Sequence, residues 1–143
     1  MKRNATWIIG SWLTGHIVLI AGHVLLVFLY SVTVAPGLTN AEYSQFALDS
    51  GPWFSIVSGG PVFYIIARVL RKRLAPNGRR AGLLVWALYS ATDAAIVLAS
   101  SAPLGPWFTL KWVASQSVKL AGVLLANRKS GPGTNAPLPR PAD

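Results

Sequence analysis

The sequence predicts an all-α membrane protein, an antiparallel bundle of four transmembrane helices with both termini in the cytoplasm. First, 52% of the 143 residues are hydrophobic and only 12% are charged, a composition far more apolar than that of an ordinary soluble domain. Second, four apolar segments approach the roughly 20 residues with which a helix crosses a bilayer. These predicted spans are residues 7–33, 53–70, 81–100 and 107–126. Residues 1–127 therefore form one predicted transmembrane domain.

The third observation is the position of the basic residues, which indicates the orientation. Lysine and arginine beside a span resist translocation, so they mark the cytoplasmic side. Lys2 and Arg3 precede the first span, whereas the connections 34–52 and 100–106 contain no basic residue. The connection between the second and third spans holds a basic cluster that includes Arg71, Lys72, Arg73, Arg79 and Arg80. We therefore expect cytoplasmic termini and a place in a bacterial inner membrane. The same cluster also suits anionic lipid headgroups, an alternative that stays open.

The distribution of charge and the absence of cysteine exclude several classes of partner and cofactor. The net charge of +9 comes from 13 basic and 4 acidic residues, but these charges lie between and beside apolar segments, so a lipid bilayer and not a nucleic acid is the expected partner. The absence of cysteine excludes disulfides, thiolate metal sites and cysteine nucleophiles.

Residues 128–143, rich in Pro, Gly and Asn, are expected to form a disordered cytoplasmic tail. Residues 41–48 could form a short interfacial helix.

Ionisable side chains inside a span are costly and are functional candidates by default. Counting about 1.5 Å per residue places Asp93, Gln116 and Lys119 within roughly 5 Å of the midplane, with His16 and His23 close by. We predict a ligand or ion site in which Asp93 is the charge partner of Lys119 and the histidines titrate. Tyr89 on the third span adds a hydroxyl. The alternative is a static buried pair that fixes helix register, with histidines that only pack.

Two glycine-containing patterns add to this site. Gly59, Gly60 and Pro61 lie near the middle of the second span, where proline and glycine favour a kink or local unwinding that would expose backbone carbonyls to a ligand. An ordinary packed proline kink is the alternative. The first span carries a stripe of small residues beside its histidines, which favours a close helix contact. This small-residue stripe is Ser11, Gly15 and Gly22.

No metal or cofactor is expected. His16 and His23 are seven residues apart, about 10 Å along a helix, which is too far for two ligands of one iron. A zinc site would need further ligands, and Asp93 is the only good one near the two histidines, so a zinc site is not expected. The leading hypothesis is a small transport or binding protein whose mid-membrane site takes a proton, an ion or a small molecule, and which acts as a homo-oligomer. The alternative is a non-catalytic accessory or assembly subunit of a larger membrane complex. A membrane-embedded enzyme or haem protein ranks third.

Overall fold

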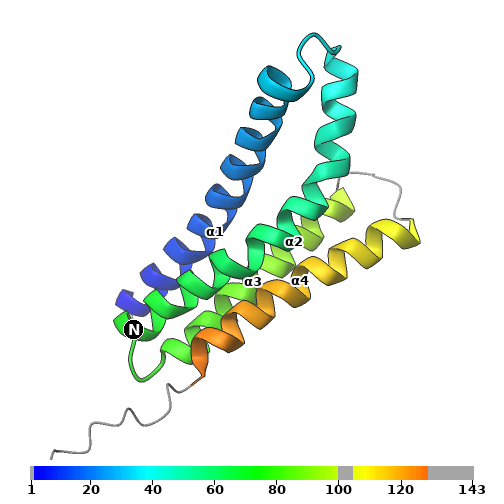
Figure 1. Ribbon diagram of the computed structural model, residues 1–143. Helices are drawn as coiled ribbons and strands as arrows, with labels where there is room; N and C mark the ends of the chain where they lie inside the picture. Colours follow the sequence, from blue (N-terminus) through cyan, green and yellow to red (C-terminus); the bar gives the residue numbers. More distant parts are fainter. Residues whose placement is uncertain (1, 100–104, 129–143) are drawn as a thin grey trace, which may run out of the picture.

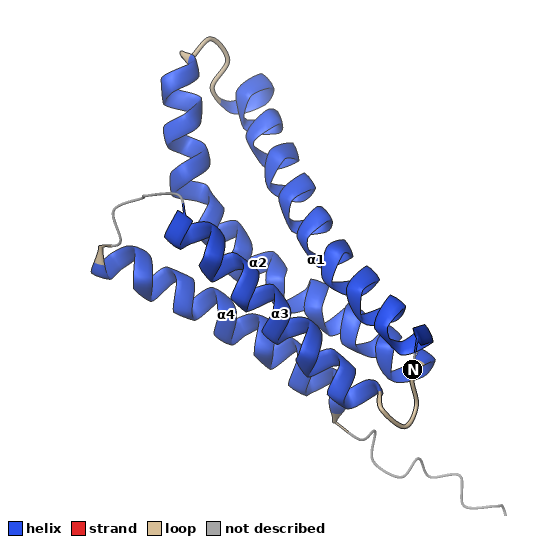
Figure 2. Ribbon diagram, turned by 180° about the vertical axis from the view of Figure 1, so that it is seen from behind, coloured by secondary structure: helices blue, strands red, loops and turns tan. Residues whose placement is uncertain are grey.

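The computed structural model describes residues 2–99 and 105–128, and this part of the chain is helical throughout apart from short connections (Figures 1 and 2). The elements are α1 (Lys2–Leu29), continued by the π-helical segment η1 (Tyr30–Val34), then α2 (Asn40–Arg73), α3 (Gly78–Ala99) and α4 (Pro106–Asn127). The start of α1, the turn between α2 and α3, and the end of α4 lie at one end of the molecule (Figure 1). The predicted helical bundle is therefore confirmed. The expected tail beyond Arg128 and most of the expected 100–106 connection lie outside the described residues.

Three helical segments are long and apolar enough to cross a membrane: Asn4–Val34, Asn40–Arg73 and Gly78–Ala99. The whole of the fourth predicted span, 107–126, lies in α4, which has the same 22-residue length as α3 but is not among these three segments. The reason is composition, because α4 carries Lys111, Lys119 and the polar run Ser115 to Ser117. Length and hydropathy thus support three of the four predicted spans and are compatible with an integral membrane protein.

Helix α2 begins at Asn40 and not near residue 53, so most of the expected 34–52 connection is helical. A capping box explains the early start: the Glu42 amide donates to Thr39 Oγ1 over 3.4 Å, and the Thr39 amide donates to Glu42 Oε2 over 2.8 Å. The expected interfacial helix 41–48 is therefore the first part of α2. It packs on η1, where the Tyr30 and Phe46 rings stack with centroids 3.7 Å apart.

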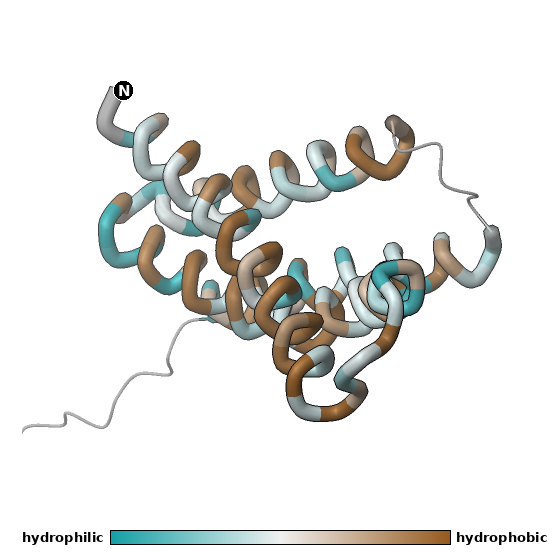
Figure 3. Tube along the Cα trace, turned by 90° about the horizontal axis from the view of Figure 1, so that it is seen from above, coloured by the Kyte–Doolittle hydropathy of each residue, from teal (hydrophilic) through white to brown (hydrophobic). Residues whose placement is uncertain are grey.

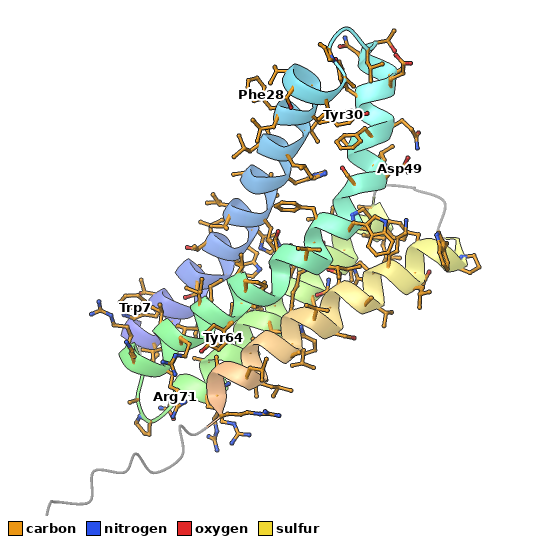
Figure 4. All side chains as sticks on the ribbon, viewed as in Figure 1. Trp7, Phe28, Tyr30, Asp49, Tyr64 and Arg71 are labelled. Atoms are coloured by element: carbon orange, nitrogen blue, oxygen red, sulfur yellow. The ribbon has the colours of Figure 1, made fainter. Side chains whose placement is uncertain are left out.

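The expected unwinding at Gly59, Gly60 and Pro61 is not seen, because α2 is helical without interruption from Asn40 to Arg73. Its clear change of direction comes earlier, just after Asp49, between the upper and lower parts of the helix (Figure 4). Pro52 lies at this point of the sequence. A proline inside a helix removes one hydrogen bond and displaces the preceding turn, which accounts for the bend.

The core lies in the lower part of the bundle, where α2 packs against each of the other three helices. Its most buried side chains are Phe63, Ala67, Leu70, Val85 and Val123. The outer surface is apolar instead of polar: only 6% of the most apolar window of the first segment is buried, and hydrophobic residues recur along the helices (Figure 3). Such an inverted surface suits lipid and not water.

Candidate functional site

Asp93 on α3 is held by two side chains of α4. Its Oδ2 accepts hydrogen bonds from Trp112 Nε1 at 2.9 Å and from Gln116 Nε2 at 2.6 Å. Gln116 is itself fixed, because its Oε1 accepts from Ser90 Oγ at 2.9 Å and its carbonyl accepts from Trp86 Nε1 at 3.1 Å. Both bonds to Asp93 use one carboxylate oxygen. Within the described residues, Oδ1 therefore keeps its capacity to accept from a ligand.

Lys119 on α4 is a fully buried cation with 0% of its surface exposed. Its Nζ donates to Ser55 Oγ at 2.9 Å and to Ser115 Oγ at 2.8 Å, and it lies 4.7 Å from the centre of the Tyr89 ring. An aromatic face attracts such an ammonium through its quadrupole. Across residues 2–99 and 105–128 no ion pair joins Lys119 to Asp93, so the expected direct pairing is not seen. The Lys119 ammonium is held instead by the two serine hydroxyls and the Tyr89 ring.

The two serine hydroxyls link the buried cation to the cavity described next. Ser55 and Ser115 lie 2.9 Å apart and hydrogen-bond to each other as well as to Lys119. Each hydroxyl has one hydrogen to donate, and one of these two hydrogens makes the serine–serine bond. The other hydroxyl hydrogen is left to donate to a third partner, and the adjacent ammonium strengthens it as a donor.

A cavity of about 160 Å³ opens between α2, α3 and α4 beside these groups. Its polar lining includes Asp93, Ser55, Ser115 and Lys111, whose Nζ lies 5.4 Å from the centre of the Trp53 ring. The residues that line the cavity thus carry a carboxylate with one free oxygen, an ammonium group, and a hydroxyl pair bonded to a second ammonium. This arrangement can hold a small charged or polar solute.

The two histidines lie on α1 and do not line this cavity, although His23 lies close to Gly51 at its wall. His16 donates from Nδ1 to the Trp12 carbonyl at 3.1 Å, its ring lies 4.2 Å from the Tyr89 ring, and its Nε2 is buried without a partner in the described structure. His23 Nε2 bonds Ser50 Oγ at 3.1 Å. Tyr89 therefore separates His16 from Lys119, and neither histidine lines the cavity.

The small-residue stripe packs against other helices of the same chain. A Cβ at Gly15 would lie 3.5 to 3.7 Å from Ile66, Phe63 and Tyr89, and one at Gly22 would lie 2.7 Å from Phe54. Ser11 is half-buried on the same helix. The two glycines thus let α1 approach α2 and α3, so this surface is not free to dock a partner protein.

Gly59 and Gly60 allow close packing of α2 against α4. A Cβ at Gly59 would lie 2.8 Å from Lys119 Cγ, and one at Gly60 would lie 2.9 Å from Val118 Cγ1. Pro61 is exposed on the outer side of α2. The two glycines form part of the surface across which α4 crosses α2.

The basic cluster divides into one anchored residue and several free ones. Arg71 donates from Nη1 to the carbonyls of Ala126 and Arg128, at 3.1 and 2.9 Å, and so holds the end of α4. Arg73 lies over the Trp7 ring, 5.5 Å from its centre. Lys72, Arg79 and Arg80 are exposed.

The sequence analysis did not predict that Ser55, Ser90 and Trp112 contact the central polar groups. The spacing of positions 112, 115, 116 and 119 does indicate that these four side chains share one face of α4. Ser55 and Gly59 are likewise four residues apart on α2. Tryptophan near the end of a span is typical of a membrane interface, so the sequence position of Trp112 does not by itself indicate a donor role.

The described residues contain no group of three or more His, Asp or Glu side chains that could hold a metal ion. Comparisons with protein-family models, with curated proteins and with solved structures gave no match to this chain. The site geometry therefore carries the functional argument alone.

Proposed function

We propose that this chain is a small transport or binding protein of the membrane, and that the cavity between α2, α3 and α4 receives a proton, an ion or a small charged solute. One observation carries the proposal: the free oxygen of Asp93 and the two hydroxyls that bind Lys119 belong to residues lining the same cavity. Charged groups at this depth are costly in a bilayer and persist where they meet water or a ligand.

The size of the cavity limits the solute. An apolar cavity of about 150 Å³ is known to hold benzene, a molecule of six heavy atoms. The cavity beside Asp93, of about 160 Å³, suits a solute of similar size or a hydrated ion. Its opposite charges favour a solute that meets the carboxylate as a donor, the hydroxyl pair as an acceptor, or both.

The proposal includes oligomerisation. Below Lys119 the core is closed, because α2 and α4 touch at Gly60 and Gly122 and the neighbouring Ala67 and Val123 are buried. One chain thus offers a cavity that reaches only part of the way through the bundle. Passage across the membrane then requires a second copy or a rearrangement of α4 against α2.

The proposed topology places the termini and the α2–α3 turn in the cytoplasm of a bacterium, with the protein in the inner membrane. Its support is that the start of α1, the basic turn and the end of α4 lie together at one end (Figure 1), whereas Glu42 and Asp49 belong to the first part of α2. Such an asymmetry of basic residues is typical of the cytoplasmic side.

Reconstituted proteoliposomes test the function with three probes: protons reported by an internal pH dye, radioactive sodium, and radioactive glycine. We expect uptake of at least one probe above that of protein-free vesicles, and loss of that uptake in Asp93→Asn. The variant keeps an acceptor oxygen for Trp112 and Gln116, so it should fold.

Asp49→Asn is the matched control, because Asp49 is exposed and bonded only by Gln45 in the described structure, at 3.1 Å. Its uptake should equal that of the wild type. Equal uptake by wild type, Asp93→Asn and empty vesicles for all three probes would remove the transport proposal.

A further inference from the structure

A second cavity lies at the opposite end of the bundle, beside the α2–α3 turn, and has a volume of about 300 Å³. We propose that this cavity is a binding site for a phosphate group, supplied by an anionic lipid headgroup or by free phosphate. Its lining residues are Arg71, Ala75, Pro76, Gly78, Arg79 and Asn127.

Two of the residues that line this cavity carry unused hydrogen-bond donors. Arg71 uses Nη1 for the two carbonyls at the end of α4, so its Nη2 and Nε keep three N–H groups without a partner among the described residues. Arg79 is exposed and has no partner there either. These two guanidinium groups offer the planar, forked donor geometry that matches phosphate oxygens.

Unpaired polar atoms of Asn127 are a second, independent observation that points to a ligand. Both of its side-chain polar atoms, Nδ2 and Oδ1, are buried and lack a hydrogen-bond partner within the described structure. Buried polar groups in proteins are nearly always paired, so an unpaired amide at the wall of a cavity calls for a ligand or an ordered water. A phosphate oxygen would accept from Nδ2, and a hydroxyl of a protonated phosphate or of a lipid headgroup would donate to Oδ1.

The charge around the cavity favours an anion. Asp49 lies in the first part of α2, far from Arg71 (Figure 4), and Glu42 lies in the first turn of the same helix. Asp93 lies 15 positions beyond Gly78 in the sequence, which is about 22 Å along α3. None of the acidic residues that the structure describes therefore neutralises Arg71 and Arg79 locally.

The site also links ligand binding to the fold. Arg71 joins α2 to the end of α4, and Gly78, at the start of α3, packs directly on the backbone of Arg71 and Leu70. A phosphate between Arg71, Arg79 and Asn127 would therefore bridge three helices. This placement is independent of the cavity beside Asp93.

Native mass spectrometry of the full chain in neutral detergent tests the proposal, with phosphatidylglycerol and phosphatidylcholine of matched acyl chains as probes. We expect one retained phosphatidylglycerol and little phosphatidylcholine. The dissociation constant should rise about tenfold in Arg79→Gln and in Asn127→Ala, since each removes a hydrogen bond to a charged group. Both variants should fold, because neither side chain makes a hydrogen bond within the described structure.

Lys72→Gln is the control: it removes the same charge from an exposed neighbour that does not line the cavity. Its affinity should stay within about twofold of the wild type, as for a single exposed charge. Equal losses in Lys72→Gln and Arg79→Gln, equal binding of the two lipids, or no bound lipid and no bound phosphate would overturn the proposal.

Competition with millimolar inorganic phosphate separates the two sources. Displacement of the lipid, or binding of phosphate in lipid-free protein, identifies free phosphate as a ligand of the site. Retention of phosphatidylglycerol under these conditions identifies the lipid headgroup. Either result agrees with the proposal, and neither depends on the transport assay.

Discussion

The stem of the Lys119 side chain lies directly against Gly59 of the neighbouring helix. A Cβ at Gly59 would stand 2.8 Å from Lys119 Cγ and 2.9 Å from Cε. The buried ammonium can reach Ser55 and Ser115 because α2 has no side chain in its way. The glycine of the expected helix break thus positions the cation of the polar site.

Gly59→Ala should destabilise the protein by about 1–3 kcal/mol, because the new methyl group overpacks a filled contact. Thermal unfolding in detergent measures the change. In a Lys119→Ala background the added loss should be much smaller, since the opposing stem is gone. Equal losses in both backgrounds would show that the Gly59 contact with Lys119 is not the cause.

Gly122→Ala should be more damaging than Gly59→Ala, because its Cβ would collide with the carbonyl oxygen of Gly60 and not with a side chain. Backbone cannot move aside without separating α2 from α4. Gly10→Ala is the control, since a Cβ there meets nothing within 4 Å and alanine is the better helix former. A Gly122→Ala melting temperature as high as that of Gly10→Ala would contradict this packing.

Trp112→Phe should destabilise the protein by about 1.5–3 kcal/mol, because it removes a hydrogen bond to the charged Asp93 while retaining most of the ring. Trp107→Phe is the matched control on the same helix, since Trp107 is 68% exposed and should lose less than about 0.5 kcal/mol. Chemical denaturation of both variants provides the comparison. Similar losses at both positions would argue against the Asp93 bond.

Lys119→Met should leave the folded protein as stable as the wild type or more so. Methionine keeps the unbranched stem against Gly59, removes a buried charge, and leaves Ser55 and Ser115 bonded to each other. Lys119→Ala, which also removes the stem, should lose about 2–4 kcal/mol through the cavity it creates. A large loss in Lys119→Met, measured by thermal unfolding, would show that the ammonium itself holds the helices together.

The helices were predictable because each depends mainly on its own apolar segment of the sequence. Long apolar runs between basic turns predicted the segments that became α1 and α3. The start of α2 was missed although its cause, the capping box of Thr39 and Glu42, is visible in the sequence. Pro52 after Gly51 looked like the end of a loop, yet it lies inside the helix and accompanies its bend.

The members of the polar layer were predictable, but their pairing was not. The helical rise per residue predicts that Asp93, Gln116 and Lys119 lie at a similar depth in the membrane. In the structure Asp93 bonds Gln116, and Lys119 bonds Ser55 and Ser115 beside the same cavity. Which side chain bonds which depends on the rotation of α4 against α3. The position of α4 also depends on its contact with α2 at Gly60 and Gly122, a relation between two helices that no single segment encodes.

The central claim is that water-borne solutes reach the hydroxyls beside Lys119, and the reactivity of Ser115→Cys tests it most directly. The chain has no native cysteine, so a single introduced thiol can be followed with aminoethyl methanethiosulfonate. Ala67→Cys is the comparison, because both positions are almost fully buried, at 3% and 0% exposed, but only Ser115 lines the cavity. We predict that the thiol at position 115 reacts at least tenfold faster, whereas equally inert thiols would contradict an open cavity.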